Sequence, residues 1–139
     1  YAEAGKGASC SSLADGRVTG LKLDEGGLDF DEMKGGASIR DVAEPARTQM
    51  RDKLRALPGR WFPGSAGILG TAIASGTQNF LFHATCTPWD HAPVDLLCRE
   101  AGGHVGMIND GARYNAAMPG GILVASCHPS WQRLSDYLT

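Results

Sequence analysis

The chain has 139 residues, and its 42% of hydrophobic and 20% of charged residues are typical of a soluble globular protein with room for about one domain. Its formal net charge of −2 excludes the strongly basic surface that attracts nucleic acid. No apolar run approaches the roughly 20 residues of a membrane-spanning helix. We therefore expect a cytoplasmic protein whose partners include neither nucleic acid nor a membrane. The chain begins with Tyr1 rather than Met, which suggests a piece of a longer product.

Four cysteines, at positions 10, 86, 98 and 127, are widely scattered and form no CxxC pair. A chain of this length does not need disulfides for stability, so we expect four free thiols, although spacing alone also permits a disulfide.

The first 40 residues predict little regular structure. Residues 1–25 combine a glycine-rich turn with short extended segments, and residues 26–41 are rich in Gly, Asp and Glu, so we expect mostly loop there. Asp29, Asp31 and Glu32 lack the alternating acidic positions and the fixed glycine of a calcium-binding loop. We therefore interpret them as a solvated acidic surface.

Residues 42–57 predict a helix that Asp41 caps, with Pro45 in its first turn and Pro58 and Gly59 ending it. The expected buried stripe is Ala43, Ala46, Met50, Leu54 and Leu57. The basic residues lie mostly off this stripe. They predict a solvated face, the alternative being contact with a phosphate or a partner chain.

A short strand over residues 60–62 is expected to lead into a helix over residues 66–75. This helix consists of small and apolar residues, which favours a central position in the fold. Glycines surround its start. The free N–H groups of such a helix N-terminus suit an anion or a substrate hydroxyl.

Buried strands are expected over residues 80–84, 104–108 and 122–126, with a tight turn at residues 109–111. A closing helix over residues 129–138 should bury Trp131, Leu134 and Leu138. This order of elements predicts an α/β fold, in which a layered mixed sheet has helices on both faces. We expect residues 1–40 to be the end of an upstream domain and residues 41–139 to be the α/β domain.

Residues 89–103 predict one amphipathic helix that a pair of glycines ends. Val94, Leu97, Cys98 and Ala101 have the spacing of a single buried face, and Asp95 and Arg99 are spaced as an i,i+4 ion pair (Pro93 fits the first turn). Gly102 or Gly103 would supply the left-handed residue after the helix.

Asp90 stands at the expected start of this helix, where aspartate is a preferred cap. The alternative interpretation is a ligand of a hard cation such as Mg²⁺, since the helix dipole favours negative charge at this end.

This stretch resembles the C-terminal signature of the inositol monophosphatase family. The signature is Trp-Asp-x-Ala, a short apolar helix and Glu-Ala-Gly-Gly, and it matches Trp89, Asp90, Ala92 and residues 100–103. Members are Mg²⁺-dependent, often lithium-sensitive phosphomonoesterases, commonly dimeric. The resemblance therefore implies that Asp90 is a catalytic residue and a metal ligand, that the cofactor is Mg²⁺, and that the protein is a homodimer with the fold of the family's C-terminal half.

The resemblance extends from about residue 62 to the end, and the glycine-rich opening is loosely similar to a strand-and-turn segment of the family. In the family, a Gly-Ser/Thr-Ala that opens a helix contacts the non-phosphate part of the substrate, and Gly64, Ser65 and Ala66 match it. Seven residues before Asp90, the type member has a Glu that binds inositol hydroxyls. This chain has His83 there, so we expect His83 to contact the substrate and a phosphomonoester other than inositol phosphate becomes the better candidate.

The family supplies most of its metal ligands from an upstream half, through a Glu-Glu pair and an Asp-Pro-x-Asp-Gly-Thr segment, and neither occurs in this chain. We therefore expect the C-terminal part of a Mg²⁺-dependent phosphatase that hydrolyses a small phosphate monoester with a metal-activated water. The 139 residues alone should be inactive. One alternative is a non-catalytic module that binds a ligand or a partner. Another is a zinc site of His83, Cys86 and His91.

Overall fold

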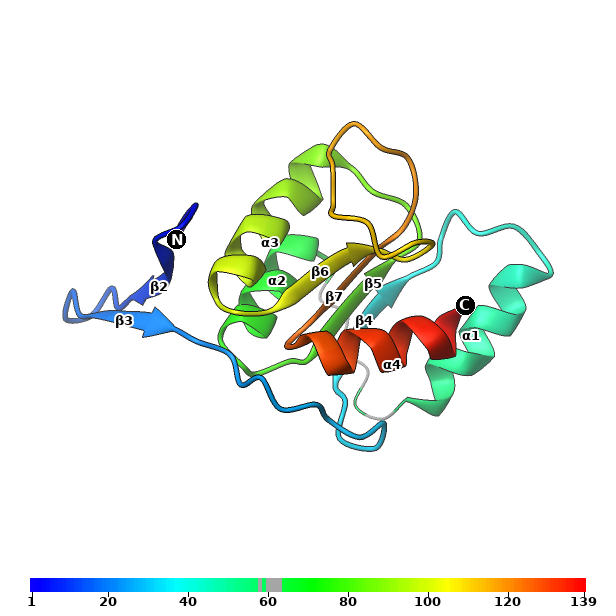
Figure 1. Ribbon diagram of the computed structural model, residues 1–139, viewed down its shortest axis with the longest axis horizontal. Helices are drawn as coiled ribbons and strands as arrows, with labels where there is room; N and C mark the ends of the chain where they lie inside the picture. Colours follow the sequence, from blue (N-terminus) through cyan, green and yellow to red (C-terminus); the bar gives the residue numbers. More distant parts are fainter. Residues whose placement is uncertain (58, 60–63) are drawn as a thin grey trace.

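The structure is a computed structural model, and it describes residues 1–57, 59 and 64–139. These residues form two sheets and four helices (Figure 1). The strands are β1 (Ala2–Glu3), β2 (Gly7–Ser11), β3 (Val18–Leu21), β4 (Gly35–Ser38), β5 (Phe80–His83), β6 (His104–Met107) and β7 (Ile122–Ala125). The helices are α1 (Ala46–Ala56), α2 (Ala66–Ala74), α3 (Pro88–Glu100) and α4 (His128–Leu138).

A four-stranded mixed sheet forms the centre of the molecule, in the order β4-β5-β7-β6. β4 runs parallel to β5, whereas β7 is antiparallel to both β5 and β6. All residues of β5 and β7 are buried, which explains why both read as continuous apolar segments rather than as alternating ones. The three buried strands expected from the sequence are confirmed.

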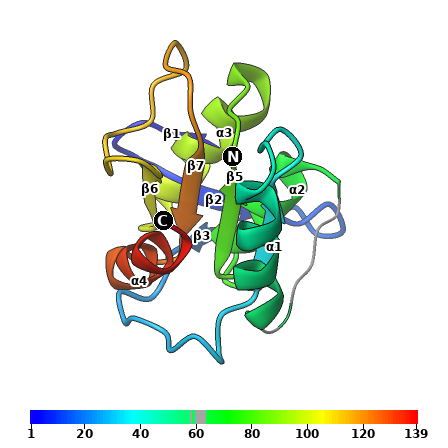
Figure 2. The same ribbon diagram turned by 90° about the vertical axis from the view of Figure 1, so that its right-hand side faces the viewer.

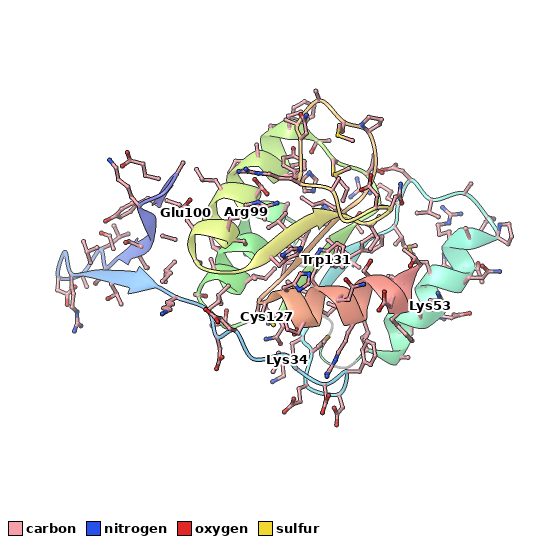
Figure 3. The ribbon with its side chains drawn as sticks, in the orientation of Figure 1. Lys34, Lys53, Arg99, Glu100, Cys127 and Trp131 are labelled. Atoms are coloured by element: carbon pink, nitrogen blue, oxygen red, sulfur yellow. The ribbon has the colours of Figure 1, made fainter. Side chains whose placement is uncertain are left out.

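Two pairs of helices cover this sheet, one pair on each face (Figures 1 and 2). On one face, Leu69 and Ile73 of α2 pack with Val94 and Cys98 of α3. On the other face, Leu54 of α1 packs with residues of α4. α4 buries the predicted Trp131, Leu134 and Leu138 together with Ser130 and Ser135 (Trp131 is labelled in Figure 3). The indole N–H of Trp131 donates to the Leu123 carbonyl at 2.8 Å. The layered mixed sheet with helices on both faces is therefore confirmed.

The first three strands form a small antiparallel sheet that projects from the α2/α3 side. The carboxylate of Glu100, at the end of α3, accepts hydrogen bonds from the backbone N–H groups of Gly5 and Gly7 at 2.9 and 2.8 Å. Leu23 continues the attachment, because its N–H donates to the Ala101 carbonyl at 2.7 Å. The C-terminal end of α3 thus holds the small sheet against the domain.

Strand β4 corrects the expectation that residues 26–41 are mostly loop. Gly35, Gly36, Ala37 and Ser38 have no β-branched or aromatic side chain, so the sequence carries no strand signal there. The partner strand requires this composition, because a Cβ atom at Gly35 would lie 2.2 Å from the Phe80 carbonyl oxygen. β4 is therefore a strand whose small residues permit a close backbone approach.

Two helices begin at other residues than predicted. α1 begins at Ala46 with Pro45 as its N-cap, rather than at residue 42 with Asp41 as its cap. The residue before a proline avoids the helical conformation, so Pro45 delays the start. In α3 the N-cap is Thr87 and Asp90 lies within the first turn, because Thr87-Pro88 takes the N-cap and N1 positions. Pro93 consequently lies inside the helix rather than in its first turn.

The remaining features of α3 are confirmed. Asp95 and Arg99 form an ion pair with 2.6 Å between Oδ1 and Nε. Gly102 follows the helix with a φ of +94°, the left-handed conformation that glycine adopts without strain. All four cysteines are free thiols.

The expected strand over residues 60–62, and Pro58 as a helix stop, lie outside the described residues. In the part of the chain that is described, no helix is long and apolar enough to cross a membrane.

Candidate functional site

A pocket of about 260 Å³ lies where β4 and β5 end and where α2 and α3 begin. Backbone N–H groups without helical partners and side chains of loops gather at such a place, as at the carboxyl ends of parallel strands in many α/β proteins. The pocket is lined by Ser38, Arg40, Asp41, Gly64, Ser65, Ala66, His83, Thr85, Thr87, Asp90 and His91. All five predicted site residues thus border one cavity, although they come from three separate segments of the chain.

The N-terminus of α2 contributes Gly64, Ser65 and Ala66. Gly64 has a φ of +76°, and Ser65 is the extended N-cap whose Oγ accepts a hydrogen bond from the Ile68 N–H at 3.4 Å. α2 has no acidic residue in its first turn, so no side chain of its own neutralises the positive end of the helix dipole. This end can therefore interact with an anion or with a hydroxyl group.

The N-terminus of α3 contributes Asp90. The Thr87 hydroxyl donates to Asp90 Oδ2 at 2.6 Å, and the Asp90 N–H donates to the Thr87 carbonyl at 3.2 Å. No other described residue forms a hydrogen bond with the Asp90 carboxylate, which is exposed. The N-cap thus orients the carboxylate and leaves its second oxygen available to a ligand.

His83 and His91 form a buried pair behind this carboxylate, with His83 Nδ1 2.8 Å from His91 Nε2. His91 Nδ1 lies 2.9 Å from both the Thr87 N–H and the Thr87 carbonyl, so the backbone of Thr87 holds this ring in place. The other ring nitrogen of His91, Nε2, forms the hydrogen bond with His83 Nδ1, whose donor depends on the tautomers of the two rings. This arrangement makes His91 the residue that orients the His83 ring.

Both imidazoles are uncharged at neutral pH. Burial lowers the pKa of His83 to about 4, and the proximity of His91 acts in the same direction, whereas Asp90 opposes both. Burial is also the main reason why the pKa of His91 is lowered. His83 therefore presents a neutral ring to the pocket rather than a cation.

Asp41 and Arg40 belong to the pocket because the segments after β4 and β5 are joined. The Thr85 hydroxyl donates to Asp41 Oδ2 at 2.9 Å, and the Ala84 N–H donates to the Ser38 carbonyl at 2.9 Å. Asp41, which the sequence suggested as a helix cap, thus holds two loops together at the pocket.

The donor atoms of the pocket suit a hard cation such as Mg²⁺, because they are carboxylate and hydroxyl oxygens rather than thiolates. Within the described residues, however, no three His, Cys, Asp or Glu side chains lie close enough together to hold a metal ion. Asp90 thus fits the role of one ligand of a larger set. The zinc alternative is not supported, since the facing nitrogens of His83 and His91 share a hydrogen bond.

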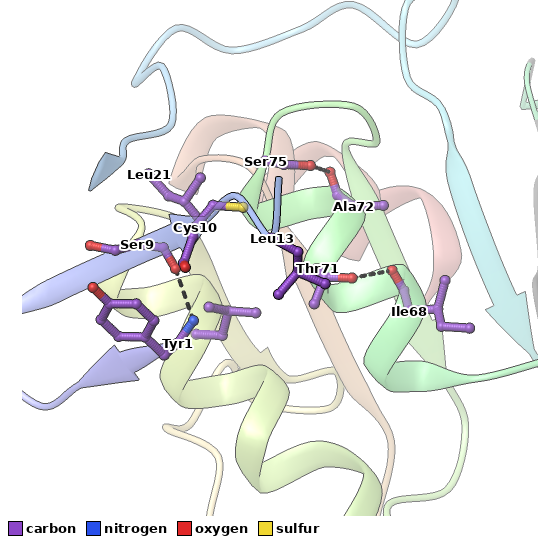
Figure 4. A pocket seen from close by; sticks show the side chains of 11 residues that line it. Tyr1, Ser9, Cys10, Leu13, Leu21, Ile68, Thr71, Ala72 and Ser75 are labelled. Atoms are coloured by element: carbon purple, nitrogen blue, oxygen red, sulfur yellow. Dashed lines mark hydrogen bonds between the residues drawn. The ribbon is translucent and has the colours of Figure 1, made fainter. Parts of the chain in front are cut away.

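A larger cavity of about 610 Å³ lies elsewhere, between the small sheet and α2 (Figure 4). Its lining includes the apolar side chains of Leu21, Ile68 and Leu97, and it contains no predicted site residue. None of the described residues that line it has a charged side chain. The smaller, polar pocket is therefore the better candidate for chemistry.

Comparison with known proteins identifies the family. The model of the inositol monophosphatase family matches residues 1–138. The chain belongs to the inositol monophosphatase family. No curated protein matches it significantly.

Solved structures of family members share the fold. Staphylococcal IMPase-II has a TM-score of 0.74 at 20% identity over 86% of this chain and 48% of its own. Inositol monophosphatase from Anabaena (Nostoc) has a TM-score of 0.71 at 23% identity, with coverages of 90% and 52%. SuhB from Mycobacterium tuberculosis has a TM-score of 0.72 at 20% identity, with coverages of 99% and 52%. The chain thus spans about half the length of these structures.

Six pocket residues were not predicted as members of this site by reasoning from the sequence: Ser38, Arg40, Asp41, Thr85, Thr87 and His91. Of these, Asp41 was expected only as a helix cap and His91 only in the zinc alternative. Arg40 could not be placed at the pocket because it follows β4, and the sequence did not predict that strand. A Thr-Pro pair is a frequent N-cap and N1 combination, so Thr87 could have been found from it.

Proposed function

We propose that this chain is the C-terminal part of a Mg²⁺-dependent phosphatase that hydrolyses a small phosphate monoester. The observation that carries the proposal is the pocket itself, since the five residues that match the family's metal and substrate positions border one cavity. Family membership supports the phosphatase chemistry. Similar structures of SaIMPase-II are of that protein bound to inositol monophosphate and to 2′AMP, which are both small phosphate monoesters.

Each residue has a proposed role. Asp90, oriented by Thr87, contributes one carboxylate ligand to Mg²⁺, which would neutralise phosphate charge and activate water when bound. Gly64, Ser65 and Ala66 present the positive end of α2 to the non-phosphate part of the substrate. His83 contacts that same part through an imidazole that His91 orients.

The remaining metal ligands are proposed to come from an upstream part of a longer protein. This is consistent with the solved relatives, which are about twice as long as the chain. The 139 residues alone should then show no turnover. We also retain as proposals that the segment 1–40, whose last strand β4 joins the central sheet, continues an upstream domain, that the protein is a homodimer, and that it is cytoplasmic.

The test is hydrolysis of a panel of phosphate monoesters by the longer protein that contains this chain. We expect release of inorganic phosphate that requires Mg²⁺ and that EDTA abolishes. The 139-residue chain, assayed beside it, should release none. If the longer protein binds the esters without hydrolysing any of them, the alternative of a non-catalytic binding module on this fold is correct.

A further inference from the structure

Arg40 differs from most of the other described arginines in having no carboxylate partner among the described residues. Among the described arginines, six form an ion pair with Asp or Glu, namely Arg17, Arg47, Arg51, Arg55, Arg99 and Arg133. Arg40 and Arg113 form neither an ion pair nor a hydrogen bond with any described residue. Of these two, Arg40 lines the polar pocket.

The backbone holds Arg40 at this place. Ser38 is paired with His83 in the parallel register of β4 and β5, and the Ser38 carbonyl accepts the Ala84 N–H at 2.9 Å. On its other side, Asp41 accepts the Thr85 hydroxyl at 2.9 Å. Arg40 therefore lies between two residues, Ser38 and Asp41, that are hydrogen-bonded to the segment after β5. These contacts fix the backbone of Arg40 at the pocket.

The nearby acids leave the guanidinium free. Asp41, the next residue, lies more than 4 Å from it by the ion-pair criterion and is engaged with Thr85. Glu44 accepts Arg47 at 2.9 Å and lies 3.9 Å from Arg51. The pocket thus contains an exposed cation with no ion-pair partner among the described residues, in addition to the carboxylates of Asp41 and Asp90.

A guanidinium group binds planar or tetrahedral oxyanions with two parallel hydrogen bonds, and it gains little from an uncharged polyol. Resting on the proposed phosphatase function, we propose that Arg40 is a specificity-determining residue that binds a second anionic group of the substrate. The substrate class is then a small phosphate monoester whose leaving group carries a carboxylate or a further phosphate. Ser65 and His83, two other polar residues of the pocket, carry no negative charge, and the carboxylate of Asp41 is engaged with the Thr85 hydroxyl.

The test compares two esters that differ only in this charge. 3-Phosphoglycerate carries a carboxylate where glycerol 3-phosphate carries a hydroxymethyl group. Both esters are assayed with Mg²⁺ and three forms of the longer protein: wild type, Arg40→Gln and Arg113→Gln. Arg113→Gln is the matched control, because it also removes an arginine without a described ion-pair partner but at a position outside the pocket. We expect wild type to prefer 3-phosphoglycerate. Arg40→Gln should raise KM for it by about 10- to 100-fold, as for loss of a charge-assisted hydrogen bond, with kcat and both constants for glycerol 3-phosphate nearly unchanged.

Arg113→Gln should leave the preference intact. An equal loss for both esters in Arg40→Gln would overturn the proposal, because Arg40 would then act on the phosphate that is hydrolysed. An unchanged preference in Arg40→Gln would overturn it as well. Absence of hydrolysis of either ester, and of every other ester of the panel, by wild type would instead overturn the proposed function, and this inference with it.

Discussion

The two helix pairs that cover the central sheet are built differently. α2 and α3 approach each other closely, since a Cβ atom at Gly70 would lie 2.7 Å from a methyl group of Val94, and the Cys98 thiol donates to the Gly70 carbonyl at 3.5 Å. α1 and α4 meet through larger side chains, and hydrogen bonds join them, such as the one that the Tyr137 hydroxyl donates to the Lys53 carbonyl at 3.0 Å.

The two pairs also differ in what their ends do. The N-terminal ends of α2 and α3 both border the polar pocket, whereas no residue of α1 or α4 lines it. One face of the sheet therefore combines packing with the candidate chemistry, and the other contributes packing alone. Substitutions on the two faces should accordingly separate stability from activity.

The largest expected loss of stability comes from the α1/α4 face. Leu134→Ala removes a side chain that is fully buried and should lower the free energy of unfolding by about 2–5 kcal/mol, measured by urea denaturation. In the longer protein, the fraction of the Leu134→Ala variant that remains folded should keep its kcat, because Leu134 does not line the pocket. Leu13→Ala, at a fully exposed leucine, is the control and should change neither quantity. A fall in kcat with Leu134→Ala would show that the α1/α4 face also affects activity, and would contradict the comparison.

A smaller loss is expected at the close contact between α2 and α3. Gly70→Ala places a methyl group against Val94 and should cost about 1–3 kcal/mol of unfolding free energy, since an overpacked contact forces the helices apart. Gly67→Ala in the same helix meets only ordinary contacts and should instead stabilise by up to about 1 kcal/mol. Equal effects of the two substitutions on the thermal midpoint would disprove the close-packing argument.

The buried His83 at the pocket should also make the free energy of unfolding depend on pH. Because burial lowers the pKa of His83 to about 4, the unfolded chain binds a proton below about pH 6.5 while the folded chain does not. Stability should therefore be constant above pH 7 and fall by about 2 kcal/mol on acidification to pH 5. Urea unfolding curves at pH 7 and pH 5 test this prediction. The His83→Gln variant should lose less unfolding free energy between these two pH values than wild type does. An unchanged loss in that variant would show that other groups are responsible.

The sequence predicted the fold where one segment carries its own signal. β5, β7, α2 and α4 have apolar patterns that are sufficient in themselves. β4 could not be predicted, because glycine has a low propensity for strands and Gly35 is explained only by the close approach of the Phe80 backbone, which leaves no room for a Cβ atom.

The candidate site was predictable where the family signature names a position, as at Asp90 and Ser65. The contacts that connect those positions were not predictable. His83 and His91 are eight residues apart on a strand and a helix, and Thr85 and Asp41 are 44 apart. Such pairs meet only through the packing of α3 and β4 against β5, which no local pattern encodes.

The most direct test of the central claim is a comparison of Asp90→Asn with Asp110→Asn in the longer protein. Both aspartates are exposed and each accepts one short hydrogen bond, from Thr87 and from the Ala112 N–H, so their substitutions should affect stability similarly. We predict that Asp90→Asn lowers Mg²⁺-dependent phosphate release by orders of magnitude while Asp110→Asn leaves it unchanged. Turnover near that of wild type in Asp90→Asn would contradict the account.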